Sequence, residues 1–263
     1  MYRYLILILI PFLSCTTGTL KVVADLPGNL KEASAIEQVA NSDLLWTIED
    51  SGNKNNLYGL NLNGTIAKDI DVSNSSNIDW EDLTSDAQGN IYIGDFGNNS
   101  KNRDDFTIYK ISDLTKDETK AERINFTLPK KVKPKDFEAF FIFNNNFYIF
   151  SKENKSAMVF KVPNRLGTHV AKLLGEFKLK GKHLKVTAAD ISRDGKTIVL
   201  LNHDKLWSIT NFKADDFLNG NLQPLAFKHN SQKEGICFKD GNSVYITDEK
   251  HKNEGGNLYA FTL

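Results

Sequence analysis

The sequence DWEDL at residues 79–83, followed by YIGDFGNN at residues 92–99, decides the fold of this chain. Each half contains a short apolar run with a carboxylate: Glu81 lies at the start of the first run and Asp95 at the end of the second. Gly and Asn lie between the runs, as is typical of a turn between two strands. We therefore expect an antiparallel strand pair with one acidic residue from each strand at the same end.

Variants of this pair recur along the chain. The first strands are expected to begin at residues 34, 81, 138, 188 and 234, which gives a period of about 50 residues, within the range of propellers and solenoids. Glu138 and Glu234 take the position of Glu81, and Asp248 takes the position of Asp95. Two copies are degenerate, because Ser34 and Ala188 replace the glutamate. The repeats predict five structural units.

The expected fold is all-β. The runs are short and rich in Ile, Val, Phe, Tyr and Leu, and no segment has a helical apolar period. Consecutive apolar residues, as in residues 147–150, favour sheets that are covered on both faces. We predict one β-propeller of five four-stranded blades, in which the N-terminal strand at residues 20–26 completes the last blade and hides its edge. Six blades are the alternative if residues 20–36 form a blade of their own.

The N-terminus reads as a targeting segment. Residues 1–14 combine a basic start with an apolar run that is short for a membrane span, and we predict a signal peptide. Cys15 follows directly, as in a bacterial lipoprotein, so residues 15–19 would form a lipidated tether and residues 20–263 the propeller domain. The protein would then be extracytoplasmic and anchored by its N-terminal lipid to a bacterial membrane, at the outer membrane or cell surface. Ordinary signal cleavage and an uncleaved anchor remain alternatives.

Composition excludes several functions. Basic and acidic residues both number 33, which argues against nucleic acid as a partner. The sequence contains neither a hydrolase nucleophile motif nor a phosphate-binding glycine loop. The remaining cysteine, Cys237, lies in an apolar run and is expected to be a small buried residue. We expect a monomer.

Propeller topology predicts an acidic channel mouth. The starts of the first strands and the ends of the second strands lie on one face, so acids and amides from all five units should converge there; these residues are Asp50, Glu81, Asp95, Glu138, Asn202, Glu234 and Asp248. Such carboxylates repel one another unless a cation compensates them, and Ca²⁺ or another divalent cation suits an all-oxygen site. The alternative is that these side chains form turns and bind their own backbone.

Basic residues are expected near the same mouth. Lysine-rich segments at residues 130–135 and 178–185 lead into the third and fourth units, and Lys152 lies beside the position that Asp95 has in the second unit. His203 is the histidine placed closest to the mouth. Together with a cation, these groups would hold a small anionic substrate. The alternative is that the lysine-rich segments are solvated loops, as runs of charged residues usually are.

The motifs at residues 45–52, 79–83 and 92–99, with Arg103, resemble a group of bacterial secreted β-propeller proteins. More distantly, the layout is similar to the SMP-30/gluconolactonase and SdiA-regulated propellers and to the esterase-like phytase domains. In gluconolactonase-like proteins, a glutamate that opens an inner strand joins Asn and Asp side chains to hold a divalent cation, which activates water or polarises a lactone. The resemblance implies that Glu81, Glu138 or Glu234 takes that role. Ser34, Ala188 and Ser151 depart from the pattern.

Two functions follow as hypotheses. The first is a cation-dependent hydrolase of an ester, lactone or phosphoester, with Glu81 or Asp248 as general base. Its expected metal ligands are Glu81, Glu138, Asn202, Glu234 and Asp248, and its expected substrate-binding residues are Asp50, Trp80, Asp95, Lys152 and His203. The second is a non-catalytic extracytoplasmic module that presents the same mouth to a glycan, peptide or partner protein. The fold is compatible with both.

Overall fold

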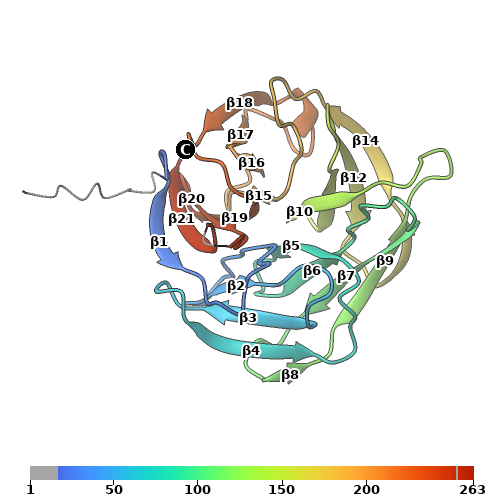
Figure 1. The fold of residues 1–263 in the computed structure, drawn as a ribbon. Coiled ribbons are helices and arrows are strands. Elements are labelled where there is room, and N and C mark those ends of the chain that lie inside the picture. Colours follow the sequence, from blue (N-terminus) through green and yellow to red (C-terminus); the bar gives the residue numbers. More distant parts are fainter. Residues whose placement is uncertain (1–16, 253) are drawn as a thin grey trace, which may run out of the picture.

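A computed structural model describes residues 17–252 and 254–263. The chain forms a five-bladed β-propeller in which the blades surround a central axis, with β5, β10, β15 and β19 near the centre and β1, β4, β14 and β18 towards the outside (Figure 1). The prediction of an all-β propeller with five blades is confirmed.

The first three strands of each blade are antiparallel and follow one another along the chain from the centre outwards. Blade 1 comprises β2 (Leu45–Thr47), β3 (Asn56–Leu60), β4 (Ile66–Val72) and β8 (Glu118–Thr119). Blade 2 comprises β5 (Trp80–Ser85), β6 (Ile91–Asp95), β7 (Asp105–Ile111), β9 (Glu122–Thr127) and β13 (Gly167–Val170). Blade 3 comprises β10 (Phe137–Phe143), β11 (Asn146–Ser151), β12 (Ala157–Pro163) and β14 (Lys172–Phe177). Blade 4 comprises β15 (Ala189–Ile191), β16 (Ile198–Leu201), β17 (Lys205–Thr210) and β18 (Asn221–Ala226), with the 3-10 helix η1 (Phe217–Asn219) before β18. Blade 5 comprises β19 (Lys233–Asp240), β20 (Ser243–Asp248), β21 (Asn257–Thr262) and β1 (Lys21–Asp25).

The blade edges depart from a simple repeat in four places. β1 pairs antiparallel with β21, so the N-terminal strand closes the last blade as predicted. β8 and β13 pair in parallel with the outer strands β4 and β9, and each comes from a later part of the chain than the strand it covers. The segment expected to form the first strand of blade 1 makes only isolated bridges, Ala33 with Glu49 and Glu37 with Trp46.

The core lies between the blades. Five clusters of buried apolar side chains occupy the five blade interfaces. Ile91 and Ile93 of β6 face blade 1, whereas Tyr92 between them faces blade 3. Because successive side chains of a strand point to opposite faces, an inner strand with both faces covered needs apolar residues at consecutive positions.

Two buried aspartates accept hydrogen bonds from backbone amides of the central strands in neighbouring blades. The carboxylate of Asp82 is fully buried, and its Oδ2 accepts hydrogen bonds from the amides of Phe140, at 3.0 Å, and Ala189, at 3.3 Å. Asp190 Oδ2 accepts one from the amide of Phe238 at 2.7 Å. These bonds join blades 2, 3, 4 and 5 at the axis and supply partners for amides that would otherwise be buried without one.

The predicted signal peptide and Cys15 lie outside the described residues. Among the residues that the structure describes, no helix has the length and apolar character needed to cross a membrane. Cys237 is buried and forms no disulfide with any described residue, as expected for a small core side chain.

Candidate functional site

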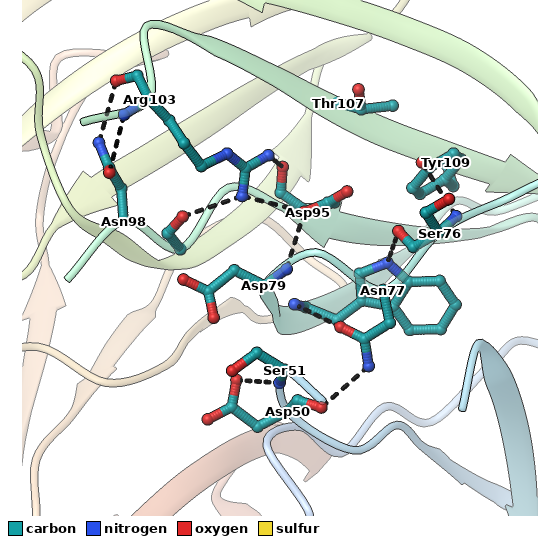
Figure 2. Close-up of polar contacts among 12 residues, drawn as sticks. Asp50, Ser51, Ser76, Asn77, Asp79, Asp95, Asn98, Arg103, Thr107 and Tyr109 are labelled. Atoms are coloured by element: carbon teal, nitrogen blue, oxygen red, sulfur yellow. Dashed lines mark hydrogen bonds and ion pairs between the residues drawn. The ribbon is translucent and has the colours of Figure 1, made fainter. Parts of the chain in front are cut away.

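The DWEDL segment is held at one mouth of the channel by the loop that follows β6. The amide of Asp79 donates to Asp95 Oδ1 at 3.1 Å, and the carbonyl of Asp79 accepts a hydrogen bond from the amide of Gly97 at 3.1 Å. Arg103 fixes this loop in turn, because its guanidinium donates to Asp95 Oδ1, to the Asp95 carbonyl and to the Gly97 carbonyl (Figure 2). The two motifs of blade 2 therefore form one rigid unit.

Asn77 joins this unit to blade 1. Its side-chain oxygen accepts a hydrogen bond from the amide of Trp80 at 3.0 Å. Its side-chain nitrogen donates to the carbonyl of Asp50 at 2.9 Å (Figure 2) and to the carbonyl of Glu49 at the same distance. As a result, Asp50, three residues after β2, lies next to Asp79, which directly precedes β5.

Three carboxylates meet where the two blades join. One oxygen each of Asp50, Asp79 and Glu81 lies within 4.8 Å of the other two. Oxygen ligands that bind one Ca²⁺ at about 2.4 Å are at most about 4.8 Å apart, so the three oxygens fit one ion. We refer to Asp50, Asp79 and Glu81 as the acidic cluster.

Glu81 is the most unusual member of the acidic cluster. Its exposed fraction is only 7%, yet its carboxylate accepts no hydrogen bond from any described residue. Gly97 allows this position, because a Cβ at residue 97 would lie 2.1 Å from Glu81 Oε1 and 2.4 Å from Asp79 Cγ. A buried carboxylate without a donor is costly, and a bound cation would remove that cost.

The electrostatics agree with this geometry. Burial, followed by repulsion from Asp50, raises the pKa of Asp79 to about 6. Burial, followed by repulsion from Glu138 and Asp50, raises the pKa of Glu81 well above its ordinary value. Without a compensating positive charge, these carboxylates therefore hold their protons more tightly than exposed carboxylates do.

Glu138 and Lys152 form an ion pair beside the acidic cluster, with 2.6 Å between Nζ and Oε2. The other oxygen of Glu138, Oε1, is buried and has no hydrogen-bond partner among the described residues. Burial raises the pKa of Glu138 to about 8, although Lys152 opposes that shift. Burial alone would lower the pKa of Lys152, but Glu138, Glu234 and Glu81 raise it, so the amine stays charged.

The remaining rim of the mouth is also acidic. His203 Nε2 lies 3.1 Å from Glu234 Oε1, so these two predicted site residues are neighbours. Burial, with repulsion from Glu234 and Asp50, raises the pKa of Glu249 to about 8. The lysines of the two lysine-rich segments, apart from Lys135, are exposed, as expected for solvated loops.

Other predicted site residues lie in structural positions. Trp80 is fully buried between blades 1 and 2, and its indole nitrogen donates to the carbonyl of Ser76 at 3.1 Å. Asp248 is fully buried, and its carboxylate accepts from Ser231 Oγ, the Tyr259 hydroxyl and the amide of Asn257. Its hydrogen bonds therefore hold it in the end of blade 5.

Asp95 and Asn202 are likewise engaged by their own loops. Asp95 is fully buried and pairs with Arg103 at 3.1 Å. The side-chain nitrogen of Asn202 donates to the carbonyl of Lys185. For these two residues, the structure favours the alternative in which polar side chains at strand ends satisfy nearby backbone.

Three contributors to the mouth are absent from the sequence-predicted site. Asp79 and Glu249 were not among the candidate ligands, and Asn77 was not recognised as the link between blades. Asp79 had a visible signal, because it directly precedes the strand that carries Glu81. The role of Asn77 depends on carbonyls 27 and 28 residues away in the chain and has no local signal.

The chain resembles known proteins in fold. An aldose sugar dehydrogenase from Streptomyces coelicolor, in its PQQ-bound form, matches with a TM-score of 0.56 at 9% identity over 94% of this chain and 98% of that chain. A gluconolactonase from Xanthomonas campestris matches with a TM-score of 0.52 at 11% identity over 97% and 94%. A chain of a nidogen/laminin complex matches with a TM-score of 0.51 at 11% identity over 83% and 73%. No protein-family model and no curated protein sequence matches the chain. At these identities, the similarity shows a common propeller fold.

Proposed function

We propose that the acidic cluster binds a divalent cation, Ca²⁺ foremost, and that the protein is a cation-dependent hydrolase of an ester, lactone or phosphoester. The observation that carries the proposal is the carboxylate of Glu81, which is nearly buried, accepts no hydrogen bond from a described residue and has one oxygen within 4.8 Å of oxygens of Asp50 and Asp79. Hard oxygen ligands of this kind suit Ca²⁺.

The bound cation would polarise the substrate and lower the pKa of a coordinated water. Glu138 is placed to accept a proton, because Oε1 has no hydrogen-bond partner and Lys152 holds Oε2 at 2.6 Å. The positively charged Lys152 would also attract an anionic group of the substrate. The fold similarity to a gluconolactonase supports a lactone as one substrate class to test.

A binding propeller is the second candidate. The buried role of Asp248 favours it, because a residue expected to act as the general base is engaged in hydrogen bonds within the core. In that case the mouth would bind a glycan, peptide or partner protein, with the cation as a structural element. We keep the proposal of an extracytoplasmic, lipid-anchored monomer for both functions.

Calorimetric titration of Ca²⁺ tests the cation site. Glu81→Gln removes a charged ligand with little change in shape, so we expect Ca²⁺ affinity to fall by about tenfold or more, since hydrogen bonds and charges at such sites contribute roughly 1.5–3 kcal/mol each. Glu122→Gln is the matched control, since Glu122 lies on the outer strand β9 and, among the described residues, forms an ion pair with Lys110 alone. Absence of Ca²⁺ binding by the wild type would refute the site.

A turnover screen separates the two functions. Lactones, p-nitrophenyl esters and p-nitrophenyl phosphate would be incubated with the wild type and with Glu138→Gln, with and without a chelator. The hydrolase proposal requires turnover that the chelator abolishes and that Glu138→Gln reduces. Calcium binding without turnover on any of these substrate classes would favour the binding propeller.

A further inference from the structure

A cavity lies at the end of the propeller axis opposite to the acidic cluster. The inner strands run from the acidic cluster to this end, so Glu81 and Ser85 on β5 are separated by about 13 Å at 3.3 Å per residue. The cavity has a volume of about 710 Å³, and its lining includes Glu37, Ser85, Ile142, Asp190 and Arg193. We refer to it as the second-mouth pocket. Its volume is in the range of small-molecule sites.

Glu37 is an unsatisfied acid in the lining of this pocket. Its exposed fraction is 6%. Its Oε1 accepts a hydrogen bond from Ser85 Oγ at 2.7 Å, whereas its Oε2 is buried and has no partner in the part of the chain that the structure describes. The neighbouring Asp190 differs, because both of its oxygens are occupied, by the amides of Ile191 and Phe238 at 2.7 Å. Glu37 therefore provides the free acceptor of the pocket.

The charges of the lining favour a positive ligand. Four carboxylates line the pocket, those of Glu37, Asp86, Asp190 and Asp194, against the single guanidinium of Arg193. Arg193 is exposed and forms no ion pair with a described residue. Apolar side chains, among them Ile142, complete the walls. An anionic ligand would be repelled by this lining.

We propose that the second-mouth pocket binds a small organic cation, an alkylammonium or guanidinium group, whose N–H donates to Glu37 Oε2. The cavity is much larger than a metal ion needs, and no group of three metal-ligating side chains occurs here among the described residues. An ammonium or guanidinium group carries a positive charge and several N–H donors. The Glu37 carboxylate and the side-chain oxygens of the Asn and Gln residues in the lining can accept hydrogen bonds from these donors. Burial and the charge of Asp190 also raise the pKa of Glu37 well above its ordinary value, and Arg193 only partly opposes this.

Calorimetry on the full-length protein with 1,4-diaminobutane tests the proposal. We expect Glu37→Gln to weaken binding by about tenfold or more, because a charge-assisted hydrogen bond is lost. Arg193→Ala should strengthen binding several-fold, because it removes the competing positive charge; this residue is exposed, so the variant is expected to fold even if Glu37→Gln does not. Glu81→Gln should leave diamine binding unchanged, which separates this pocket from the acidic cluster.

Two results would overturn the proposal. The first is no binding of the diamine at concentrations up to about 10 mM, or binding that neither Glu37→Gln nor Arg193→Ala alters. The second is tighter binding of neutral D-glucose than of the diamine with the same dependence on Glu37, which would assign the pocket to a polyhydroxylated ligand. Neither result depends on whether the acidic cluster binds Ca²⁺.

Discussion

The carboxylate of Asp82 joins three blades at the propeller axis, and its removal should cost several kcal/mol of stability. Its Oδ2 accepts hydrogen bonds from the amides of Phe140 in blade 3 and Ala189 in blade 4, and its Oδ1 accepts from the amide of Leu83. Asp82→Ala leaves the two inter-blade amides without this acceptor at a fully buried position. Since each unsatisfied buried amide costs roughly 1–3 kcal/mol, we expect the free energy of unfolding to fall by about 2–6 kcal/mol.

Urea denaturation, followed by the fluorescence of the buried Trp80 and Trp207, measures this loss. Asp82→Asn is the matched control, because its side-chain oxygen can take the place of Oδ2 and keep both inter-blade bonds, and its amide nitrogen loses only the bond from the Leu83 amide within β5. The control should therefore retain most of the stability lost in Asp82→Ala. Hydrogen exchange should show faster exchange of the Phe140 and Ala189 amides in the alanine variant alone. If the two variants are equally stable, the inter-blade hydrogen bonds do not provide the stability that we assign to them.

Three further predictions concern the channel mouth that holds the acidic cluster. Gly97→Ala should weaken Ca²⁺ binding more than it lowers thermal stability, because the new Cβ would lie 2.1 Å from Glu81 Oε1 and displace the flexible carboxylate; unchanged affinity by calorimetry would contradict the assigned ligand geometry. Ca²⁺ affinity should fall as the pH decreases through about 6, because the pKa of Asp79 is raised to about 6 and protons then compete with the cation for this carboxylate. Calorimetry at pH 5, 6 and 7.5 checks this expectation. Arg103→Met should lower the free energy of unfolding by about 2–4 kcal/mol in urea, because it leaves the buried carboxylate of Asp95 unpaired, and a loss below about 0.5 kcal/mol would contradict a structural role for this pair.

The sequence predicted the strands of blade 2 closely, because local pattern and blade environment agree there. The expected strand pair, with Glu81 at the start of one strand and Asp95 at the end of the other, corresponds to the antiparallel strands β5 and β6. The prediction for the first strand of blade 1 was less accurate, because residues 34–36 lie between two isolated β-bridges and form no strand. The outer strands β8 and β13 were not anticipated, because each pairs with a strand that is distant in sequence.

The site was predicted only in part, because strand ends have two possible uses. Asp50 and Glu81 reach the acidic cluster, and Glu138 and Lys152 lie beside it as an ion pair. Asp248 occupies an equivalent strand end but accepts three hydrogen bonds within blade 5. Sequence alone does not distinguish an acid that faces the channel from one that binds its own loop, since both follow the same apolar run.

The repeat of about 50 residues and the doubly apolar inner strands by themselves determined an all-β propeller with the acids of the inner strands at one face. The prediction of the fold succeeded because blade formation depends on short-range periodicity, which each unit contains in full. Only the tertiary structure decided which acids meet, because Asn77 sets the distance between Asp50 and Asp79 through contacts between blades. The pocket at the second mouth, with the unpartnered oxygen of Glu37, likewise exists only once the ring has closed and the ends of five blades surround one axis.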